Sequence, residues 1–355
     1  MIRPLPHLEA MEPYALADLG DSKTVSLAQN ESDFPPSPLA IAAGRVALDH
    51  SQLYPDPDWT QLCEAIGELH DLSEGTILCG AGSMELIGCL IRAYAGPGDT
   101  VVGTQYGYAF VATACAQVGS AYLRAAESNL TVSVDAILKT LTADTRIVFL
   151  CNPGNPTGTA IPNAEIIRLR RAMPNDVLLI IDQAYAEFCD DVQMPREVFA
   201  LTEQGNTVIV RTFSKAYALA GARAGWGYFP PIIAQELRKL LNPNNISIVS
   251  QAMATAAMLD QLHMKEIVQK TARIRNEFAQ SARGLGINIP DSHTNFVLLQ
   301  FDSAETAKCI DKALRDNELL LRGMGGYGLP DCLRATICAR PIMHRVLHVL
   351  KEAMR

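Results

Sequence analysis

Residues 207–226 read TVIVRTFSKAYALAGARAGW, and the apolar first part of this stretch ends at Phe213. Ser214 and Lys215 follow on a turn, and Arg223 comes eight residues after the lysine. Similar apolar runs recur upstream and once downstream, separated by longer helical stretches. Such runs are typical of strands buried on both faces, so we expect an α/β fold with a mostly parallel sheet covered by helices. The other runs are TILCG (76–80), TVVG (100–103), RIVFLC (146–151), DVLLIID (176–182) and GWGYF (225–229).

The sequence changes character after about residue 246. A long helical stretch comes first, and strands and helices then alternate: 248–286, 295–301, 333–338 and 341–355. This pattern indicates a second, smaller α+β domain, against which the first residues of the chain are expected to pack. The predicted parts are an N-terminal arm belonging partly to the small domain (1–40), a large domain (41–245) and a small C-terminal domain (246–355). Ligands are expected in a cleft at the carboxyl ends of the strands.

The composition narrows the class of protein. The 355 residues include 30 Lys and Arg against 38 Asp and Glu, and this net charge of −8 argues against a nucleic-acid surface. No run of about 18 apolar residues is present, and the N-terminus lacks a signal-peptide core, so we expect a cytoplasmic protein with no membrane span. The nine cysteines are scattered without a C-x-x-C pair, which indicates reduced thiols and no metal site.

Lys215 is the first candidate catalytic residue. Chemistry based on pyridoxal-5′-phosphate (PLP) needs a lysine amine that forms an imine with the cofactor aldehyde, near groups that hold a phosphate. Ser214 and Arg223 supply such groups in the same segment. A lysine at a strand end is more often a solvated surface residue, so this interpretation depends on the other motifs.

Asp182 and Tyr185, in DVLLIIDQAYAEF (176–188), are the next candidates. Asp182 closes an apolar strand, so its carboxylate is expected to project into the cleft, where it can pair with a protonated pyridine nitrogen. Tyr185 lies three residues further on and can donate its hydroxyl to the phenolate oxygen of the cofactor. Either residue alone is more often a helix cap or a core side chain.

The segment LCGAGSMELIG (78–88) reads as a strand, a glycine turn and a helix start, with Ser83 as the expected N-cap. The backbone N–H groups of Gly82, Ser83 and Met84 would then form an anion site. A nicotinamide-binding protein is the rival interpretation of this segment. It is weak, because Glu85 stands where G-x-G-x-x-G requires its third glycine.

Two further turns follow strands. FLCNPGNPTGT (149–159) is a rigid turn from which the amide of Asn155 can reach a ring substituent. TQYGYAFV supplies Tyr106, Tyr108 and Phe110, one of which is expected to stack on the cofactor ring while the others are core residues.

Taken together and in this order, these segments resemble the fold-type I PLP aminotransferases, and within them the histidinol-phosphate aminotransferase branch. The resemblance runs from PY (13–14) to LRATI (333–337). It implies a large domain with a mostly parallel mixed sheet between helices and a smaller α+β domain. It also implies the following PLP ligands: Lys215 bound covalently, Asp182 at the pyridine nitrogen, Tyr185 and Asn155 at the phenolate oxygen, Tyr108 (or Tyr106 after a register slip) on the ring, and Gly82, Ser83, Met84, Ser214 and Arg223 around the phosphate.

The resemblance extends to the substrate and to a second subunit. Tyr54 in LYPDPD (53–58) is implied to reach the phosphate of the neighbouring subunit's cofactor, which predicts a homodimer. The chain departs from the family pattern at Gln183, within QNESDFPPSP (29–38) and in the ATICA that follows Arg334, and the last two departures bear on the substrate. The implied substrate residues are Arg334 as a carboxylate clamp, Arg322 as a weaker candidate, and Tyr14 and Asn30 nearby.

The implied reaction is a ping-pong amino transfer from a donor such as L-histidinol phosphate to a 2-oxo acid such as 2-oxoglutarate, with the freed Lys215 as general base. Alternative donors are the aromatic amino acids phenylalanine and tyrosine. A related class decarboxylates amino-acid phosphates and consumes no 2-oxoglutarate. A regulatory PLP-binding module without activity is disfavoured, because every catalytic residue type is present.

Overall fold

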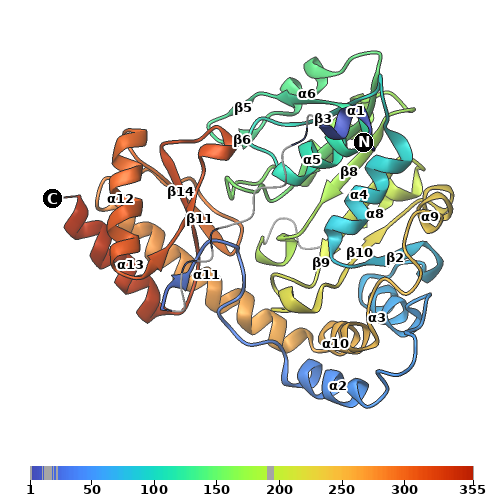
Figure 1. The fold of residues 1–355 in the computed structure, drawn as a ribbon, viewed down its shortest axis with the longest axis horizontal. Coiled ribbons are helices and arrows are strands. Elements are labelled where there is room, and N and C mark those ends of the chain that lie inside the picture. Colours follow the sequence, from blue (N-terminus) through green and yellow to red (C-terminus); the bar gives the residue numbers. More distant parts are fainter. Residues whose placement is uncertain are drawn as a thin grey trace.

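The computed structural model describes residues 2–9, 11, 18, 20, 23–189 and 196–354. This part of the chain forms a large domain around a seven-stranded sheet and a smaller domain around a three-stranded sheet (Figure 1). Each domain has a hydrophobic core of its own. The architecture is therefore the α/β fold with an α+β lobe that the sequence predicts.

The large sheet is built from the predicted apolar runs. Its strand order is β2-β10-β9-β8-β7-β3-β4, in which β10 is antiparallel to both neighbours and the remaining pairs are parallel. The carboxyl ends of β2, β9, β8, β7 and β3 consequently meet at one edge of the sheet. The edge strand β4 is absent from the predicted runs, because most of its AYLRA side chains are exposed or partly buried. The strands are β2 (Ile77–Gly80), β3 (Thr100–Thr104), β4 (Ala121–Ala125), β7 (Thr145–Cys151), β8 (Leu178–Asp182), β9 (Thr207–Thr212) and β10 (Gly225–Tyr228), and a hairpin is formed by β5 (Glu127–Ser128) and β6 (Thr131–Val132).

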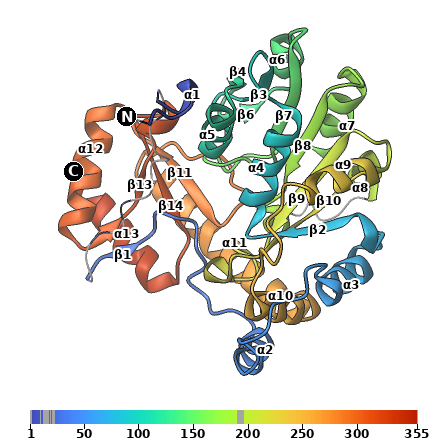
Figure 2. The same cartoon turned by 45° about the vertical axis from the view of Figure 1, so that its right-hand side comes forward.

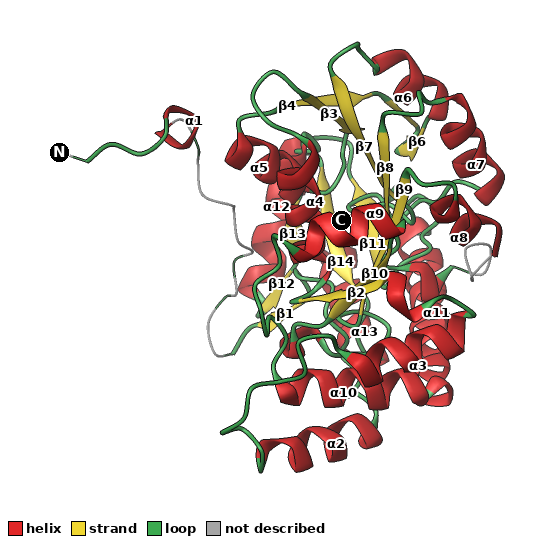
Figure 3. Cartoon of the chain, turned by 90° about the vertical axis from the view of Figure 1, so that its right-hand side faces the viewer, coloured by secondary structure: helices red, strands yellow, loops and turns green. Residues whose placement is uncertain are grey.

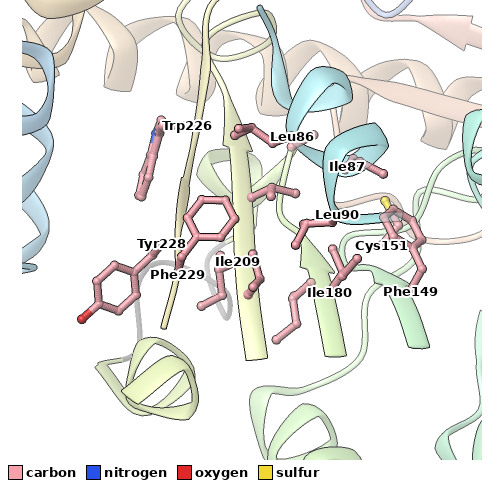
Figure 4. Packing of buried hydrophobic residues seen from close by; sticks show 14 of the residues in the cluster. Leu86, Ile87, Leu90, Phe149, Cys151, Ile180, Ile209, Trp226, Tyr228 and Phe229 are labelled. Atoms are coloured by element: carbon pink, nitrogen blue, oxygen red, sulfur yellow. The ribbon is translucent and has the colours of Figure 1, made fainter. Parts of the chain in front are cut away.

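Helices cover both faces of this sheet. Figure 4 shows Leu86 and Leu90 of α4 over the strands, and each of these fully buried side chains contributes about 1.5–3 kcal/mol to folding. Trp226 of β10 points to the opposite face and stacks on Phe199 of α8 at a centroid distance of 6.4 Å. The helices of this domain are α2 (Pro38–Leu48), α3 (Thr60–His70), α4 (Ser83–Tyr94), α5 (Ala109–Val118), α6 (Val134–Thr140), α7 (Asn163–Ala172), α8 (Arg196–Glu203), α9 (Pro231–Arg238) and α10 (Ile248–Leu259).

The start of α4 differs from the prediction. Ser83 is the first helical residue, and the N-cap is Gly82, whose φ of 78° lies in the region that favours glycine. The predicted Ser83 cap is therefore wrong. The carboxylate of Glu85 instead closes the turn, because its Oε2 accepts hydrogen bonds from Ala81 N at 2.6 Å and from Asn245 Nδ2 at 2.7 Å.

The small domain packs helices against an antiparallel sheet of order β11-β14-β13. The short strand β1 pairs with β12, which ties the chain at residues 25–26 to this domain. The long helix α11 runs between the two domains (Figure 2). The elements are β1 (Val25–Ser26), α11 (Gln261–Arg283), β11 (Phe296–Gln300), α12 (Ala304–Asp316), β12 (Leu319–Leu320), β13 (Arg322–Gly323), β14 (Cys332–Thr336) and α13 (Arg340–Ala353).

Two segments pack differently from the predicted division of the chain. Helix α1 (Pro6–Glu9) contacts α5 of the large domain, and residues 2–5 extend away from the body (Figure 3). Helix α10 packs on α2 and α3, so its Ala254 and Met258 lie in the core of the large domain. The predicted borders at residues 40 and 245 stay a proposal, and the packing favours moving the second one to Asp260, between α10 and α11.

Within the described ranges, no helix has both the length and the apolar character needed to cross a bilayer.

Candidate active site

The strand ends open onto a cavity of about 390 Å³ that is lined by both domains. Among the described residues, one predicted site residue is not in its lining: Tyr54 lies on the surface with 87% of its area exposed. Tyr14 falls outside the described residues. The predicted residues that line the cavity are Asn30, Gly82, Ser83, Met84, Tyr108, Asn155, Asp182, Tyr185, Ser214, Lys215, Arg223, Arg322 and Arg334.

Lys215 follows β9 and places its amine in the cavity. The Nζ atom donates hydrogen bonds to the carbonyl oxygens of Asn30 at 2.9 Å and Gln29 at 3.2 Å. Burial lowers the pKa of Lys215 to about 8, helped by the charge of Arg334 and opposed by that of Glu31. A larger fraction of this amine is therefore neutral and nucleophilic at neutral pH than for an exposed lysine.

Asp182 is the last residue of β8 and is almost fully buried. Burial raises the pKa of its carboxyl to about 7, against the backbone N–H of Ala184, which donates to Oδ1 at 3.0 Å, and the charge of Lys215. A buried carboxyl of this kind favours a cationic N–H group as its partner, because the opposite charge restores the ionised form.

The Tyr185 hydroxyl is oriented by Asn30. Asn30 adopts a left-handed conformation with φ of 57°. Its backbone N–H donates to Thr336 Oγ1 at 3.0 Å, and its carbonyl oxygen accepts from Asn295 Nδ2 at 3.0 Å. Asn30 Nδ2 then donates to the Tyr185 oxygen at 2.9 Å. Because that oxygen acts as an acceptor and burial raises the pKa of Tyr185, the hydroxyl keeps its proton for donation to a ligand.

Asn155 lies on the turn after β7, where Arg334 fixes its orientation. Arg334 Nη1 donates to Asn155 Oδ1 at 2.6 Å, and Nη2 donates to the carbonyl oxygen of Ala28 at 2.7 Å. The base of the turn is held by Asn152, whose side chain makes two hydrogen bonds with the backbone of Ile161 at 2.9 and 3.0 Å. With the oxygen of Asn155 taken by Arg334, its amide nitrogen is the atom that can donate toward a ligand.

The N-terminus of α4 and Arg223 form an anion site. Residues 82–84 line the cavity where the helix begins, and Arg223 Nη2 donates to the carbonyl oxygen of Ala81 at 3.4 Å. A Cβ atom on Gly82 would lie 2.5 Å from this Nη2, so only glycine allows the guanidinium to come so close. Ser214 adds a hydroxyl beside the guanidinium, 3.5 Å from Nη1. Backbone N–H groups, a guanidinium and a hydroxyl in this arrangement suit a phosphate.

The two candidate stacking residues, Tyr106 and Tyr108, lie in different surroundings. Tyr108 lines the cavity at the start of α5, whereas Tyr106 packs against residues of the small domain.

Two polar residues that line the cavity, Thr212 and Glu31, were not predicted from the sequence. The hydroxyl of Thr212 donates to Ser214 Oγ at 3.0 Å, and its position at a strand end, two residues before Ser214, is the signal that could have identified it.

The model of the class I and II aminotransferase family matches residues 22–350. The chain belongs to this family. It is similar to the histidinol-phosphate aminotransferase of Jannaschia sp. (strain CCS1), with 39% identity over 95% of this chain and 94% of the relative, and to that of Rhodopseudomonas palustris (strain TIE-1), with 38% identity over 100% and 99%. Among solved structures, it is similar to the histidinol-phosphate aminotransferase from Sinorhizobium meliloti in complex with pyridoxal-5′-phosphate, with a TM-score of 0.93 and 28% identity over 100% of this chain and 98% of that one.

The predicted fold, enzyme class and cofactor are thereby confirmed: the chain is a PLP-dependent aminotransferase. The cavity fits the cofactor, because each polar part of PLP finds a matching group. Lys215 would supply the amine for the aldehyde, and Asp182 the carboxyl for the ring nitrogen. Tyr185 and Asn155 would donate to the phenolate oxygen, and residues 82–84, Ser214 and Arg223 would hold the phosphate.

In the cofactor-free aminotransferase, the reaction of the Lys215 amine with PLP is expected to depend on pH. Because the neutral amine attacks the aldehyde, the rate of covalent PLP capture by Lys215 should rise with pH and level off above about 8. Replacement of Glu31 by Gln should shift this profile to lower pH, and replacement of Arg334 by Met should shift it to higher pH, since the two charges act on the amine in opposite directions. Stopped-flow absorbance across the pH range measures the profile. A rate that keeps rising to the ordinary lysine pKa of 10.5 would contradict this account.

Proposed function

We propose that this aminotransferase takes its amino group from histidinol phosphate and passes it to a 2-oxo acid such as 2-oxoglutarate. Histidinol phosphate carries a phosphate monoester where an α-amino acid carries its carboxylate. The proposal is supported by the relatives in which the same enzyme name recurs over nearly the full chain. It is carried by one observation, the pair of arginines on the small-domain side of the cavity.

Arg322 on β13 and Arg334 on β14 lie directly opposite each other across the antiparallel ladder, and both line the cavity. Arg334 is held rigidly, with its guanidinium 5.2 Å from the ring centroid of Phe296. Two guanidinium groups on neighbouring strands offer several N–H donors in fixed directions to the oxygens of one phosphate. The charge of a phosphate monoester matches this pair better than that of a single carboxylate.

Several residues of the chain would have separate roles in this reaction. When bound, PLP supplies an aldehyde for amine exchange and a ring that accepts the electron pair left at the substrate carbon. Lys215 would hold the cofactor between turnovers and, once displaced, its amine would take the proton from that carbon and deliver it to the cofactor carbon on the far side of the substrate nitrogen, a 1,3-shift. The Asp182 carboxylate would accept a hydrogen bond from the protonated ring nitrogen, and Tyr185 and Asn155 would donate to the phenolate oxygen. The anion site at α4 would keep the cofactor in place while its covalent bond to Lys215 is open.

The donor is tested with three amines: histidinol phosphate, histidinol and phenylalanine, each with 2-oxoglutarate. We expect the highest kcat/KM for histidinol phosphate. Replacement of Arg322 by Gln should lower that value by roughly 10- to 100-fold, the loss of about 1.5–3 kcal/mol from hydrogen bonds to a charged group. It should leave kcat/KM for histidinol nearly unchanged, since histidinol lacks the phosphate.

The matched control is Arg340→Gln, since Arg340 pairs with Glu277 on an exposed surface outside the cavity. This variant should leave all three values unchanged. A preference for phenylalanine, or an equal loss for histidinol and histidinol phosphate in Arg322→Gln, would overturn the assignment of the donor. Release of CO₂ from an added amino-acid phosphate, without consumption of 2-oxoglutarate, would point to the decarboxylase class instead.

We propose in addition that the enzyme acts as a homodimer in which Tyr54 reaches the neighbouring active site. The loop that carries Tyr54 is anchored, because the backbone oxygen of Asp56 accepts from Gln251 Nε2 at 2.9 Å. Large apolar side chains are exposed along α2, which precedes this loop, and at the junction of α10 and α11, and surfaces of this kind mark protein interfaces. They are Leu39, Val46, Leu48 and Leu53 on and after α2, and Leu259 and Leu262 at the junction of α10 and α11.

A mixed-dimer experiment tests this arrangement. Tyr54→Ala and Lys215→Ala subunits are each expected to be poorly active, but a mixed dimer regains one complete site, with Lys215 from one subunit and Tyr54 from the other. Random co-assembly should restore about a quarter of the wild-type activity, since half the dimers are mixed and each has one complete site of two. Mixtures no more active than the separate variants, or a monomer in sedimentation, would exclude the shared site.

We also propose a cytoplasmic location. All nine cysteines are free thiols, and all but Cys309 are buried. A chain with this many reduced thiols suits a reducing compartment.

A further inference from the structure

The turn between β3 and α5, residues 105–108, is held from outside by the hairpin of β5 and β6. The Glu127 carboxylate accepts a hydrogen bond from Tyr106 N at 3.1 Å, and Glu127 N donates to Gln105 Oε1 at 3.1 Å. Gln105 Nε2 in turn donates to the Tyr106 hydroxyl at 3.1 Å. Three hydrogen bonds thus join Glu127, Gln105 and Tyr106, and the last residue of the turn is Tyr108, which lines the cofactor cavity.

The inner side of this turn has no room for rearrangement. A Cβ atom on Gly107 would lie 3.0 Å from Thr104 Oγ1 and 3.2 Å from the carbonyl oxygen of Thr104. A Cβ atom on Gly103 would overlap the Tyr122 hydroxyl, which is inserted beneath the end of β3. The turn is therefore closely packed against Thr104 and Tyr122, and the Glu127 carboxylate holds it with a further hydrogen bond.

The same hairpin also contacts the small domain. Leu130, at the tip of the hairpin, and Tyr106 pack with Leu298, Met324 and Leu329 of that domain. Leu130 has φ of 59°, which is uncommon for a bulky residue, and its carbonyl oxygen is fixed by Thr159 Oγ1 at 2.7 Å. Figure 1 shows β5 and β6 on the side of the large domain that faces β14. The hairpin is thus clamped at its tip as well as at Glu127.

We propose that Glu127 is a positioning residue, which acts through Gln105 and Tyr106 to hold the Tyr108 ring in place against PLP. This inference rests on the proposed role of Tyr108 as the residue that stacks on the cofactor. Glu127 is half-buried, and burial raises the pKa of its carboxyl while the backbone N–H of Tyr106 lowers it. Its removal would leave the Tyr106 N–H without its acceptor, and the turn would lose a hydrogen bond that ties it to the hairpin.

The test compares Glu127→Ala with Glu127→Gln and with Ser128→Ala, an exposed neighbour on the same strand. PLP affinity is measured by titration of the cofactor-free protein, and the visible circular dichroism of the holoenzyme reports the orientation of the ring. Glu127→Ala should bind PLP roughly 5- to 30-fold more weakly, with altered dichroism. Glu127→Gln keeps an acceptor oxygen for Tyr106 N and should restore both properties, and Ser128→Ala should match the wild type.

Tyr108→Ala completes the experiment as a double-mutant cycle. If Glu127 acts through the ring, its replacement has no further effect in the Tyr108→Ala background. An undiminished effect there, or a wild-type affinity and dichroism in Glu127→Ala, would overturn the proposal for Glu127. A Tyr108→Ala protein with unchanged affinity and dichroism would instead overturn the stacking role of Tyr108. Should Glu127→Ala fail to fold, Gln105→Ala removes the other two hydrogen bonds of the set, and the same outcomes decide.

Discussion

The amine of Lys215 lies in a partly buried cavity between groups of opposite charge. Arg334 and Glu31 act on its pKa in opposite directions, while burial itself lowers it. This balance exists because strands β8 and β9 end side by side, which places Asp182 and the Ser214–Lys215 turn at the same edge of the sheet. Every residue of these two strands is buried, which fixes that edge, and the low dielectric around it strengthens the interaction between charges.

The small domain supplies one of the charges that act on the pKa of Lys215. Arg334 comes from β14, and its guanidinium reaches across to Asn155 of the large domain and to the backbone of Ala28. Thr336, two residues later on the same strand, holds Asn30, whose carbonyl oxygen accepts from the Lys215 amine. The segment around Asn30 is therefore positioned by the small domain so that it contacts Lys215 of the large domain.

The buried strands of the large sheet could be predicted from their apolar runs, whereas the edge strand β4, whose side chains are mostly exposed or partly buried, could not. Asp182 and Lys215 could be identified only together with the other motifs, since either residue at a strand end more often has a structural role or lies in solvent. The sequence predicts Tyr108 as the stacking residue and leaves Tyr106 as the alternative after a register slip. That Tyr108 lines the cavity while Tyr106 packs on the small domain appears only in the folded chain. Glu127 lies in a two-residue strand without periodicity, and its contacts with residues 105–106 appear only once the chain is folded. The cap at Gly82 was missed because Ser83 is the better cap by residue type, whereas the observed φ requires glycine.

Borohydride trapping decides whether PLP is bound covalently to Lys215. The purified holoenzyme is reduced, digested and mapped by mass spectrometry, with Lys215→Ala treated in parallel. We expect one stable pyridoxyl adduct, on the peptide that contains Lys215, and none in the variant. An adduct on another lysine of the wild type, or an equally labelled Lys215→Ala protein, would contradict a covalent bond to Lys215.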